Sequence, residues 1–339
     1  MPPHPSREIR FAAHPEGLPR PECFELVETE VPDPAEGQFL VRNLWMSVDP
    51  YMRGRMMARR SYVPGFELGK PLEGGAIGRV VASRHPGFPE GSLVSSMAGW
   101  RELFLTDGTL VGRIEPEPGI PIQAYLGVMG MPGLTAYVGL LDVARLGEGE
   151  RVFVSAAAGA VGATACQIAR IRNGYVVGSA GSPEKCRWLV EECGIDRAIC
   201  YRDTPDLTAA VAEAFPDGID VYFENVGGAH LEAALESMKD FGRIPLCGMI
   251  SRYNDERPVP GPANLVLAVG RRLRLEGFIV SDHLGRLRDF HRDMAAWIRE
   301  GRMKWRETVV EGLESAPQAF LGLFEGRNVG KMLVKLADA

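Results

Sequence analysis

The segment that most constrains the fold is VFVSAAAGAVG, residues 152–162. It begins with large apolar residues, continues with small ones and carries glycines at positions 159 and 162. A short apolar run, followed by glycines and then by a helical pattern, predicts a buried strand, a tight turn and a closely packed helix. We therefore predict a strand over residues 151–155 and a helix over residues 163–170.

The spacing Ala157-x-Gly159-x-x-Gly162 is that of a dinucleotide-binding fingerprint with alanine in the first glycine place. Gly159 would let the backbone approach a pyrophosphate, whose charge would lie at the N-terminus of the helix. Gly162 would let that helix pack closely on the strand. Tight packing alone could also explain both glycines, but a second strand, predicted over residues 174–178, follows at the expected distance. This context favours cofactor binding.

The end of the second strand distinguishes the two nicotinamide cofactors. An NAD-binding unit usually carries Asp or Glu about 20 residues after the fingerprint, where the carboxylate holds the ribose 2′-hydroxyl. Here the sequence reads GSAGS, residues 178–182, and cations follow at Lys185 and Arg187. Glu184 lies inside the start of the next predicted helix, residues 183–192, and is poorly placed for that role. The two cations could be solvated helix charges, but the missing carboxylate favours NADPH over NADH.

The pattern along the chain predicts two domains and an α/β fold class. Residues 1 to about 120 contain short β-like runs cut by Pro and Gly, typical of an antiparallel, barrel-like domain. From about residue 121, strands alternate with helical patterns, which predicts a doubly wound parallel sheet. Beyond about residue 300 the short strands and turns return, so we expect the first domain to be discontinuous. The other predicted strands are residues 38–42, 75–82, 218–223, 242–248, 273–280 and 330–335.

Composition and charge narrow the class of protein. Hydrophobic residues make up 45% and charged residues 24% of the 339, which is typical of a globular protein. A net charge of −6 gives no basic surface for nucleic acid. The chain has no run of about 18 apolar residues and no apolar leader, so we expect no membrane partner. The six cysteines show neither C-x-x-C spacing nor nearby histidines, so we expect free thiols, a cytoplasmic location and no metal site.

Several longer motifs add to the fingerprint. They are VDPYMRG at 48–54, MPGLTAY at 131–137, GSPEK at 181–185, YFENVGG at 222–228, FGRIPLCGMISRYN at 241–254 and GLFEGRNVGK at 322–331. Together they resemble the medium-chain dehydrogenase/reductase superfamily. Within it, the chain is similar to the zinc-independent group of prostaglandin reductases, leukotriene B4 12-hydroxydehydrogenases and curcumin reductases. The resemblance covers nearly the whole chain.

That resemblance implies a GroES-like catalytic domain, residues 1–123 and 299–339, and a Rossmann NADP-binding domain, residues 124–298. It also implies a homodimer. Where the zinc-dependent members carry a ligand motif, this chain has SVDPY at 47–51, so the resemblance implies no metal. By position in the motifs, the residues that would contact NADP(H) are Met131, Thr135, Gly159, Ala160, Val161, Gly162, Ser182, Lys185, Tyr201, Asn225, Cys247, Gly248, Met249, Ile250, Ser251, Phe278, Ile279, Val280 and Asn328.

Two tyrosines are the predicted catalytic residues. When hydride adds to the β-carbon of an enone, negative charge develops on the carbonyl oxygen, and a neutral phenol can stabilise that charge. Tyr253 follows the strand predicted over residues 242–248, at the edge of the sheet where ligands bind. By resemblance, Tyr51 faces the nicotinamide. Either ring could instead be a packing residue with a satisfied hydroxyl.

The sequence therefore predicts an NADPH-dependent reductase of the carbon–carbon double bond in small α,β-unsaturated ketones and aldehydes. Two alternatives remain open at this point. One is a zinc-independent NADPH:quinone reductase on the same scaffold, and the other is a nucleotide-binding protein without catalytic activity.

Overall fold

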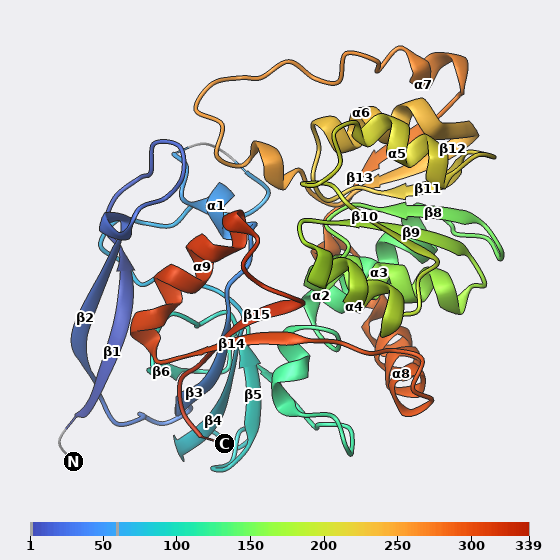
Figure 1. Cartoon of the computed structure of the whole chain (residues 1–339). Helices are drawn as coiled ribbons and strands as arrows, with labels where there is room; N and C mark the ends of the chain where they lie inside the picture. Colours follow the sequence, from blue (N-terminus) through green and yellow to red (C-terminus); the bar gives the residue numbers. More distant parts are fainter. Residues whose placement is uncertain (1–2, 59–60, 339) are drawn as a thin grey trace. The chain divides into compact units, whose positions relative to one another are not determined.

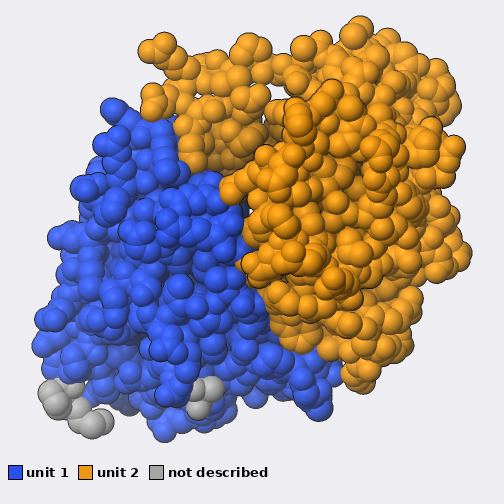
Figure 2. Space-filling model, in the orientation of Figure 1, with its two compact units in different colours: residues 1–126, 307–328, 332–339 blue, residues 127–306, 329–331 orange. Residues whose placement is uncertain are grey.

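The computed structural model describes residues 3–58 and 61–338, so the ends of the predicted domains at residues 1 and 339 lie outside the described residues. The chain forms two compact units, coloured separately in Figure 2. Unit 1 comprises residues 1–126, 307–328 and 332–339, and unit 2 comprises residues 127–306 and 329–331. The proposed domain boundaries after residues 123 and 298 stay a prediction.

Unit 2 is built on a six-stranded sheet in which every strand runs parallel to its neighbours (Figure 1). Its strand order along the sheet is β10-β9-β8-β11-β12-β13, the order of a doubly wound fold. Successive strands are added toward one edge from β8 to β10 and toward the other edge from β11 to β13. Most of these strands are apolar because helices cover both faces. The strands are β8 (Arg151–Val154), β9 (Tyr175–Ala180), β10 (Arg197–Cys200), β11 (Ile219–Phe223), β12 (Met238–Leu246) and β13 (Arg274–Gly277).

The helices of unit 2 pack in groups against this sheet. In Figure 1, α5 and α6 lie on one side of the sheet, and α3 and α4 lie on the other. The helices are α2 (Met131–Val138), α3 (Ala160–Ile171), α4 (Pro183–Glu191), α5 (Leu207–Ala214), α6 (Ala229–Ser237), α7 (Leu267–Gly270) and α8 (Leu287–Arg299). Shorter helical turns are η3 (Gly139–Val143), η4 (Ile250–Arg252) and η5 (Val280–Arg286).

Unit 1 is an antiparallel β structure. Its larger sheet has the order β14-β15-β3-β4-β5-β7, β6 pairs with β3, and β1 pairs with β2 in a separate ribbon (Figure 1). The strands are β1 (His4–Phe11), β2 (Phe24–Val31), β3 (Phe39–Ser47), β4 (Ala76–Ser83), β5 (Leu93–Ser96), β6 (Leu103–Thr106), β7 (Gly112–Arg113), β14 (Glu307–Glu311) and β15 (Lys331–Lys335). Because β14 and β15 come from the end of the chain, the sheet is completed only by C-terminal residues.

The core of unit 1 is aromatic. Phe24 stacks on Trp100 with ring centroids 5.8 Å apart, and Phe320 meets both rings edge-on. Phe320 comes from α9 (Ala316–Glu325), which buries its apolar residues against this cluster. The remaining helical segments of unit 1 are α1 (Met52–Arg55), η1 (Pro21–Cys23), η2 (Ile122–Leu126) and η6 (Leu313–Ser315).

Three details of the predicted secondary structure were wrong. The strand predicted over residues 273–280 ends at Gly277, because its last partner is Leu246, where β12 itself ends. The strand predicted over residues 242–248 begins earlier, at Met238, and also stops at Leu246. Helix α9 lies in a region for which only strands and turns were predicted. Its apolar stripe packs on a core assembled from residues distant in sequence.

The described residues contain no helix that is both long enough and apolar enough to span a bilayer.

The core of unit 2 generates a stability prediction. Phe153 is fully buried in β8, stacks on Tyr222 at 5.1 Å and meets Phe215 edge-on. Phe153→Ala removes this packing and should lower the free energy of unfolding by about 3–5 kcal/mol. The matched control is Phe241→Ala, because Phe241 is 64% exposed and its loss should change stability by only about 0.5 kcal/mol. Thermal and urea unfolding of both variants measures the difference, and similar losses would contradict the assignment of the core.

Candidate cofactor site

The glycine turn joins β8 to α3 as predicted. Gly159 is the N-cap of α3, and Gly162 lies in its first turn. A Cβ at Gly162 would lie 2.4 Å from the carbonyl oxygen of Ala156, so only glycine lets the helix approach the strand this closely. Ala156 itself takes up a left-handed conformation, with φ of 46°. The turn therefore has the close packing that a dinucleotide fingerprint requires.

The N-terminus of α3 is suited to an anion. The first N–H groups of a helix have no intrahelical acceptor, and the glycine N-cap offers no side chain to bond them. Ala160 and Val161 belong to this first turn. The helix dipole adds partial positive charge at the same place. By contrast, the first turn of α4 is capped within the chain, because Ser182 accepts a hydrogen bond from the Lys185 N–H.

Residues 329–331 complete the glycine turn within unit 2. Gly330 forms a parallel bridge with Gly159 and donates its N–H to the Ala158 carbonyl at 2.8 Å. Gly330 has a φ of 68°, and a Cβ there would lie 1.9 Å from the Arg306 carbonyl oxygen. Asn328, a predicted cofactor contact, immediately precedes this segment in the chain and belongs to unit 1.

A cationic cluster lies at the carboxyl ends of β9 and β10. A Cβ at Gly181 would come within 3.0 Å of the Tyr201 hydroxyl and 3.4 Å of Arg202 Nε, so both side chains lie over this glycine. Lys185 lies near Arg202, and burial together with that neighbouring charge lowers the pKa of the Lys185 ammonium. Two cations and a phenol around a glycine form a suitable site for a phosphate dianion.

Arg202 is the residue that the sequence analysis missed. It follows β10, whereas Arg187, the cation that was named beside Lys185, is exposed on α4. Arg202 lies 17 residues after Lys185 in the sequence, and β10 pairs with β9 to bring the two together. Its position directly after Tyr201, itself a predicted cofactor contact, is the one sequence signal that could have indicated it.

A buried carboxylate organises the ends of β8 and β11. Glu224 has no exposed surface, and its Oε1 accepts hydrogen bonds from four donors. The donors are the hydroxyls of Ser155 at 3.1 Å and Tyr222 at 2.8 Å, and the N–H groups of Val226 at 2.6 Å and Gly227 at 2.9 Å. Among the described residues, its Oε2 has no hydrogen-bond partner. Burial raises the pKa of the Glu224 carboxyl above its ordinary value, and the hydrogen bonds oppose that rise.

The same residue connects β11 to the loop after β12. The Glu224 carbonyl accepts from the N–H groups of Cys247 at 3.0 Å and Gly248 at 3.1 Å. The next residue, Asn225, donates its side-chain amide to the Ser155 carbonyl at 2.7 Å, and its own carbonyl accepts from the Ile250 N–H at 3.1 Å. The predicted contacts Asn225, Cys247, Gly248, Met249, Ile250 and Ser251 therefore form one hydrogen-bonded pair of loops.

Tyr253 directly follows η4 in this second loop. A Cβ at Gly248 would lie 2.8 Å from the Tyr253 hydroxyl, so the phenol turns back over the glycine that follows β12. The hydroxyl is thus held at the carboxyl edge of the parallel sheet, beside the loops that carry Asn225 and Cys247. This is where ligands bind in doubly wound sheets.

The other predicted contacts of unit 2 lie on two further segments. Phe278 follows β13 and packs edge-on against Phe223, with centroids 6.4 Å apart, and Ile279 and Val280 continue from it into η5. Met131 begins α2 and is 40% exposed, while Thr135 donates its hydroxyl to the Met131 carbonyl at 2.8 Å.

Tyr51, the other predicted catalytic residue, belongs to unit 1, where it precedes α1 and packs against the unit 1 core. Burial, followed by the negative charge of Asp49, raises the pKa of the Tyr51 phenol well above its ordinary value. The phenol therefore stays protonated and able to donate a hydrogen bond across the physiological pH range.

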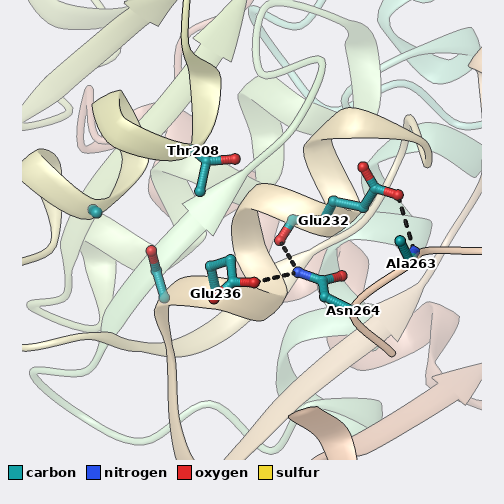
Figure 3. A pocket seen from close by; sticks show the side chains of 7 residues that line it. Thr208, Glu232, Glu236, Ala263 and Asn264 are labelled. Atoms are coloured by element: carbon teal, nitrogen blue, oxygen red, sulfur yellow. Dashed lines mark hydrogen bonds between the residues drawn. The ribbon is translucent and has the colours of Figure 1, made fainter. Parts of the chain in front are cut away.

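A pocket of about 530 Å³ lies elsewhere in unit 2, between α5, α6 and residues 263–264. As Figure 3 shows, Asn264 donates to the main-chain carbonyl of Glu232 and to the carboxylate of Glu236, both at 2.9 Å. Ala263 donates its N–H to the Glu232 carboxylate at 3.1 Å. None of the predicted site residues lines this pocket. The hydrogen bonds of Ala263 and Asn264 anchor the far end of the long segment that follows Tyr253.

The Glu224 network generates a prediction about pH. Because the folded-state pKa is raised, the carboxyl favours folding at low pH, and this contribution disappears as pH rises through that pKa. Glu224→Gln has the same shape without a titrating group, so its stability should decline less than that of the native protein between pH 4.5 and 8. Melting temperatures across this range measure the effect. Glu213→Gln, at an exposed position on α5, is the control, and parallel curves for the native protein and Glu224→Gln would contradict the prediction.

Comparison with known proteins shows two family matches. Residues 7–114 match the N-terminal domain of oxidoreductase, and residues 160–299 match the zinc-binding dehydrogenase family. Among the described residues, no group of three or more His, Cys, Asp or Glu side chains is placed to hold a metal ion.

Full-length relatives are also similar. The chain is 42% identical to the NADPH-dependent curcumin reductase of Escherichia coli, over 98% of this chain and 97% of that protein. It is 43% identical to an NADP(+)-dependent 2-alkenal reductase of Nicotiana tabacum, over 95% of this chain and 96% of that protein. The crystal structure of CurA from Vibrio vulnificus in complex with NADPH matches with a TM-score of 0.93 and 39% identity, covering 98% of this chain and 100% of that one. The chain therefore belongs to the medium-chain dehydrogenase/reductase superfamily, in the group that contains the curcumin and 2-alkenal reductases.

Proposed function

We propose that this protein is an NADPH-dependent reductase of the carbon–carbon double bond in small α,β-unsaturated ketones and aldehydes. The observation that carries the proposal is the similarity, at 42–43% identity over nearly the whole chain, to proteins named for this chemistry. Two quinone oxidoreductases of known structure are only 20% identical to this chain, so their likeness indicates a shared fold and does not favour quinone as the substrate.

The residues present fit the cofactor. The close approach at Gly162 and the N-terminus of α3 suit a pyrophosphate. Lys185, Tyr201 and Arg202 suit the 2′-phosphate, and the second strand of the unit ends at Ala180 and is followed by Gly181 rather than by an acid. When bound, the nicotinamide supplies a hydride.

The tyrosines supply the proposed electrophilic assistance. As hydride reaches the β-carbon of the substrate, electron density moves to the carbonyl oxygen. Tyr253 is proposed to donate its hydroxyl to that oxygen, stabilising the charge before a proton reaches the α-carbon. Tyr51, kept neutral by its burial, is the second proposed donor. Glu224 does not face the substrate in this scheme. It fixes the two loops that carry Asn225 and Tyr253.

The proposal is tested by following NADPH oxidation with 3-nonen-2-one, with a 1,4-quinone and without substrate. Enone turnover with saturated ketone as product is the expected result. Turnover of the quinone alone would overturn the proposal in favour of a quinone reductase. NADPH binding with no turnover of either substrate would leave only a nucleotide-binding role.

We further propose that the enzyme is a cytoplasmic homodimer. All six cysteines are free, which suits a reducing compartment. Strand β13 is an edge of the unit 2 sheet, and the nearby Val266 and Val269 are 74% and 78% exposed. Exposed apolar residues beside a sheet edge favour a second copy as the partner. Val266→Asp combined with Val269→Asp should therefore shift the protein from dimer to monomer in analytical ultracentrifugation. A monomeric native protein would contradict the proposal.

The cationic cluster generates a prediction of cofactor preference. Lys185→Ala and Arg202→Ala should each raise KM for NADPH roughly tenfold or more, the effect of losing a charge-assisted hydrogen bond to the 2′-phosphate. KM for NADH, which lacks that phosphate, should stay nearly constant. Arg187→Ala is the matched control on the exposed face of α4 and should change neither constant. Equal effects on the two cofactors would remove these residues from the phosphate site.

The catalytic assignment is tested by removing single hydroxyls. Tyr253→Phe should lower kcat for enone reduction roughly a hundredfold, as expected for loss of a hydrogen-bond donor to the developing oxyanion, and leave KM for NADPH unchanged. Gly248→Ala should lower kcat as well, because the new Cβ occupies the position beside the Tyr253 hydroxyl. Tyr201→Phe is the control and should affect KM for NADPH instead. Unchanged turnover by Tyr253→Phe, with a loss in Tyr51→Phe, would transfer the role to Tyr51.

A further inference from the structure

The pocket between α5 and α6 contains buried polar atoms without a hydrogen-bond partner in the described part of the chain (Figure 3). Ser237, the last residue of α6, lines the pocket and is only 9% exposed. Its hydroxyl is one of these atoms, and the side-chain carbonyl oxygen of Asn264, which also lines the pocket, is another. Leaving a buried polar atom unpaired is unfavourable, so both atoms indicate a ligand.

The orientation of the Asn264 amide is fixed by its two hydrogen bonds. Its nitrogen donates to the main-chain carbonyl of Glu232 and to the Glu236 carboxylate, both at 2.9 Å. Because both partners are acceptors, the atom between them must be the nitrogen, and the atom without a partner must be the oxygen. Asn264 therefore offers an unused acceptor, which only a donor can satisfy.

The charge of the lining favours a cation. The described residues that line the pocket include the carboxylates of Glu232 and Glu236 and no Lys, Arg or His. Glu232 accepts from the Ala263 N–H and Glu236 accepts from Asn264, and these bonds use only Oε1 of each carboxylate. Ser237 ends α6, where the helix dipole adds partial negative charge. The pocket thus combines negative charge with unused acceptors.

The neighbouring start of α5 does not make the pocket an anion site. Thr208 and Ala212 of α5 line the pocket. Asp206 is the N-cap of this helix, and its carboxylate already accepts a hydrogen bond from the Ala209 N–H at 2.9 Å. That carboxylate also adds a further negative charge beside the pocket. In this respect the pocket is the opposite of the uncapped start of α3.

The size of the pocket favours an organic cation over a metal ion. Its volume of about 530 Å³ is within the range of small-molecule sites. The methyl groups of Ala212 and Ala263 offer apolar contacts for a hydrocarbon chain. Among the described residues, no group of three or more His, Cys, Asp or Glu side chains could hold a metal ion. The lining therefore suits ammonium groups joined by a short alkyl chain.

We propose that this pocket binds a small aliphatic diamine, a role that goes beyond the proposed reductase function. Glu232 and Glu236 are four residues apart on α6, so their carboxylates lie on one face of the helix and can each accept from an ammonium group. The Ser237 hydroxyl and the Asn264 carbonyl oxygen are the neutral acceptors. A bound diamine contacts both α6 and residues 263–264, so it also holds the end of the segment that follows Tyr253.

The test titrates 1,4-diaminobutane into the full-length protein by isothermal titration calorimetry, without NADPH or enone. One site should bind. Glu236→Gln should raise Kd about tenfold and Ser237→Ala about threefold, because a carboxylate attracts an ammonium group more strongly than a neutral hydroxyl does. Glu213→Gln removes the same charge from an exposed position on α5 and should leave Kd unchanged. Absence of binding, or equal weakening in all three variants, would overturn the proposal.

Two further measurements identify the class of ligand and locate the site. Calcium chloride and magnesium chloride should each bind more weakly than the diamine, and equal or tighter binding of either metal ion would overturn the diamine as the ligand. Hydrogen–deuterium exchange in the peptide that contains Ala263 and Asn264 should slow when the diamine is bound, whereas the peptide over residues 39–47 should be unaffected. Unchanged exchange at residues 263–264 would refute the site. None of these readouts depends on reductase activity.

Discussion

The site depends on one buried oxygen atom. Oε1 of Glu224 accepts two hydroxyl and two N–H hydrogen bonds, and these tie the end of β8 to the loop that follows β11. Its main-chain carbonyl extends the connection to the loop after β12. A buried donor that loses its acceptor carries the full cost of desolvation, so four donors on one atom hold these loops in one arrangement. Glu224 therefore positions Asn225 and Tyr253 without itself needing to contact a ligand.

The sequence was most informative where structure is decided locally. The role of Gly162 could be predicted because only a residue without a Cβ allows a helix to begin so close to its strand. The spacing of the glycines in this turn is visible in the sequence alone. The parallel, doubly wound sheet of unit 2 was also predicted from alternating strands and helices, since a parallel sheet needs a crossover between strands. The remaining cofactor contacts came from the family resemblance and stay predictions.

What the sequence could not indicate arises from pairing between distant segments. Arg202 joins Lys185 only because β10 lies beside β9. Strand β13 ends at Gly277 because its neighbour β12 ends at the paired residue, Leu246. The residue types at 278–280 do not indicate this end. The four donors around Glu224 come from residues 155 to 227, so their convergence on a single carboxylate becomes visible only in three dimensions.

The closeness of Lys185 and Arg202 also affects how strongly this cluster would attract a phosphate. Two like charges near a partly buried site repel each other, and this repulsion contributes to the lowered pKa of the lysine. A dianion between them would offset the repulsion and add attraction. Both effects would strengthen the binding of NADPH relative to that of NADH. An uncharged ribose hydroxyl at the same place would leave the repulsion unrelieved.

The bridge between Gly159 and Gly330 has a consequence for biosynthesis. The glycine turn is translated roughly halfway along the chain, yet the N–H group that bonds the Ala158 carbonyl arrives about 170 residues later. On the ribosome the parallel sheet can therefore assemble before its nucleotide turn is closed, because domains begin to fold as they emerge. Ribosome-bound chains arrested before residue 330 would hold this sheet with an unfinished turn, and the final contact would form only after the last segment had left the exit tunnel.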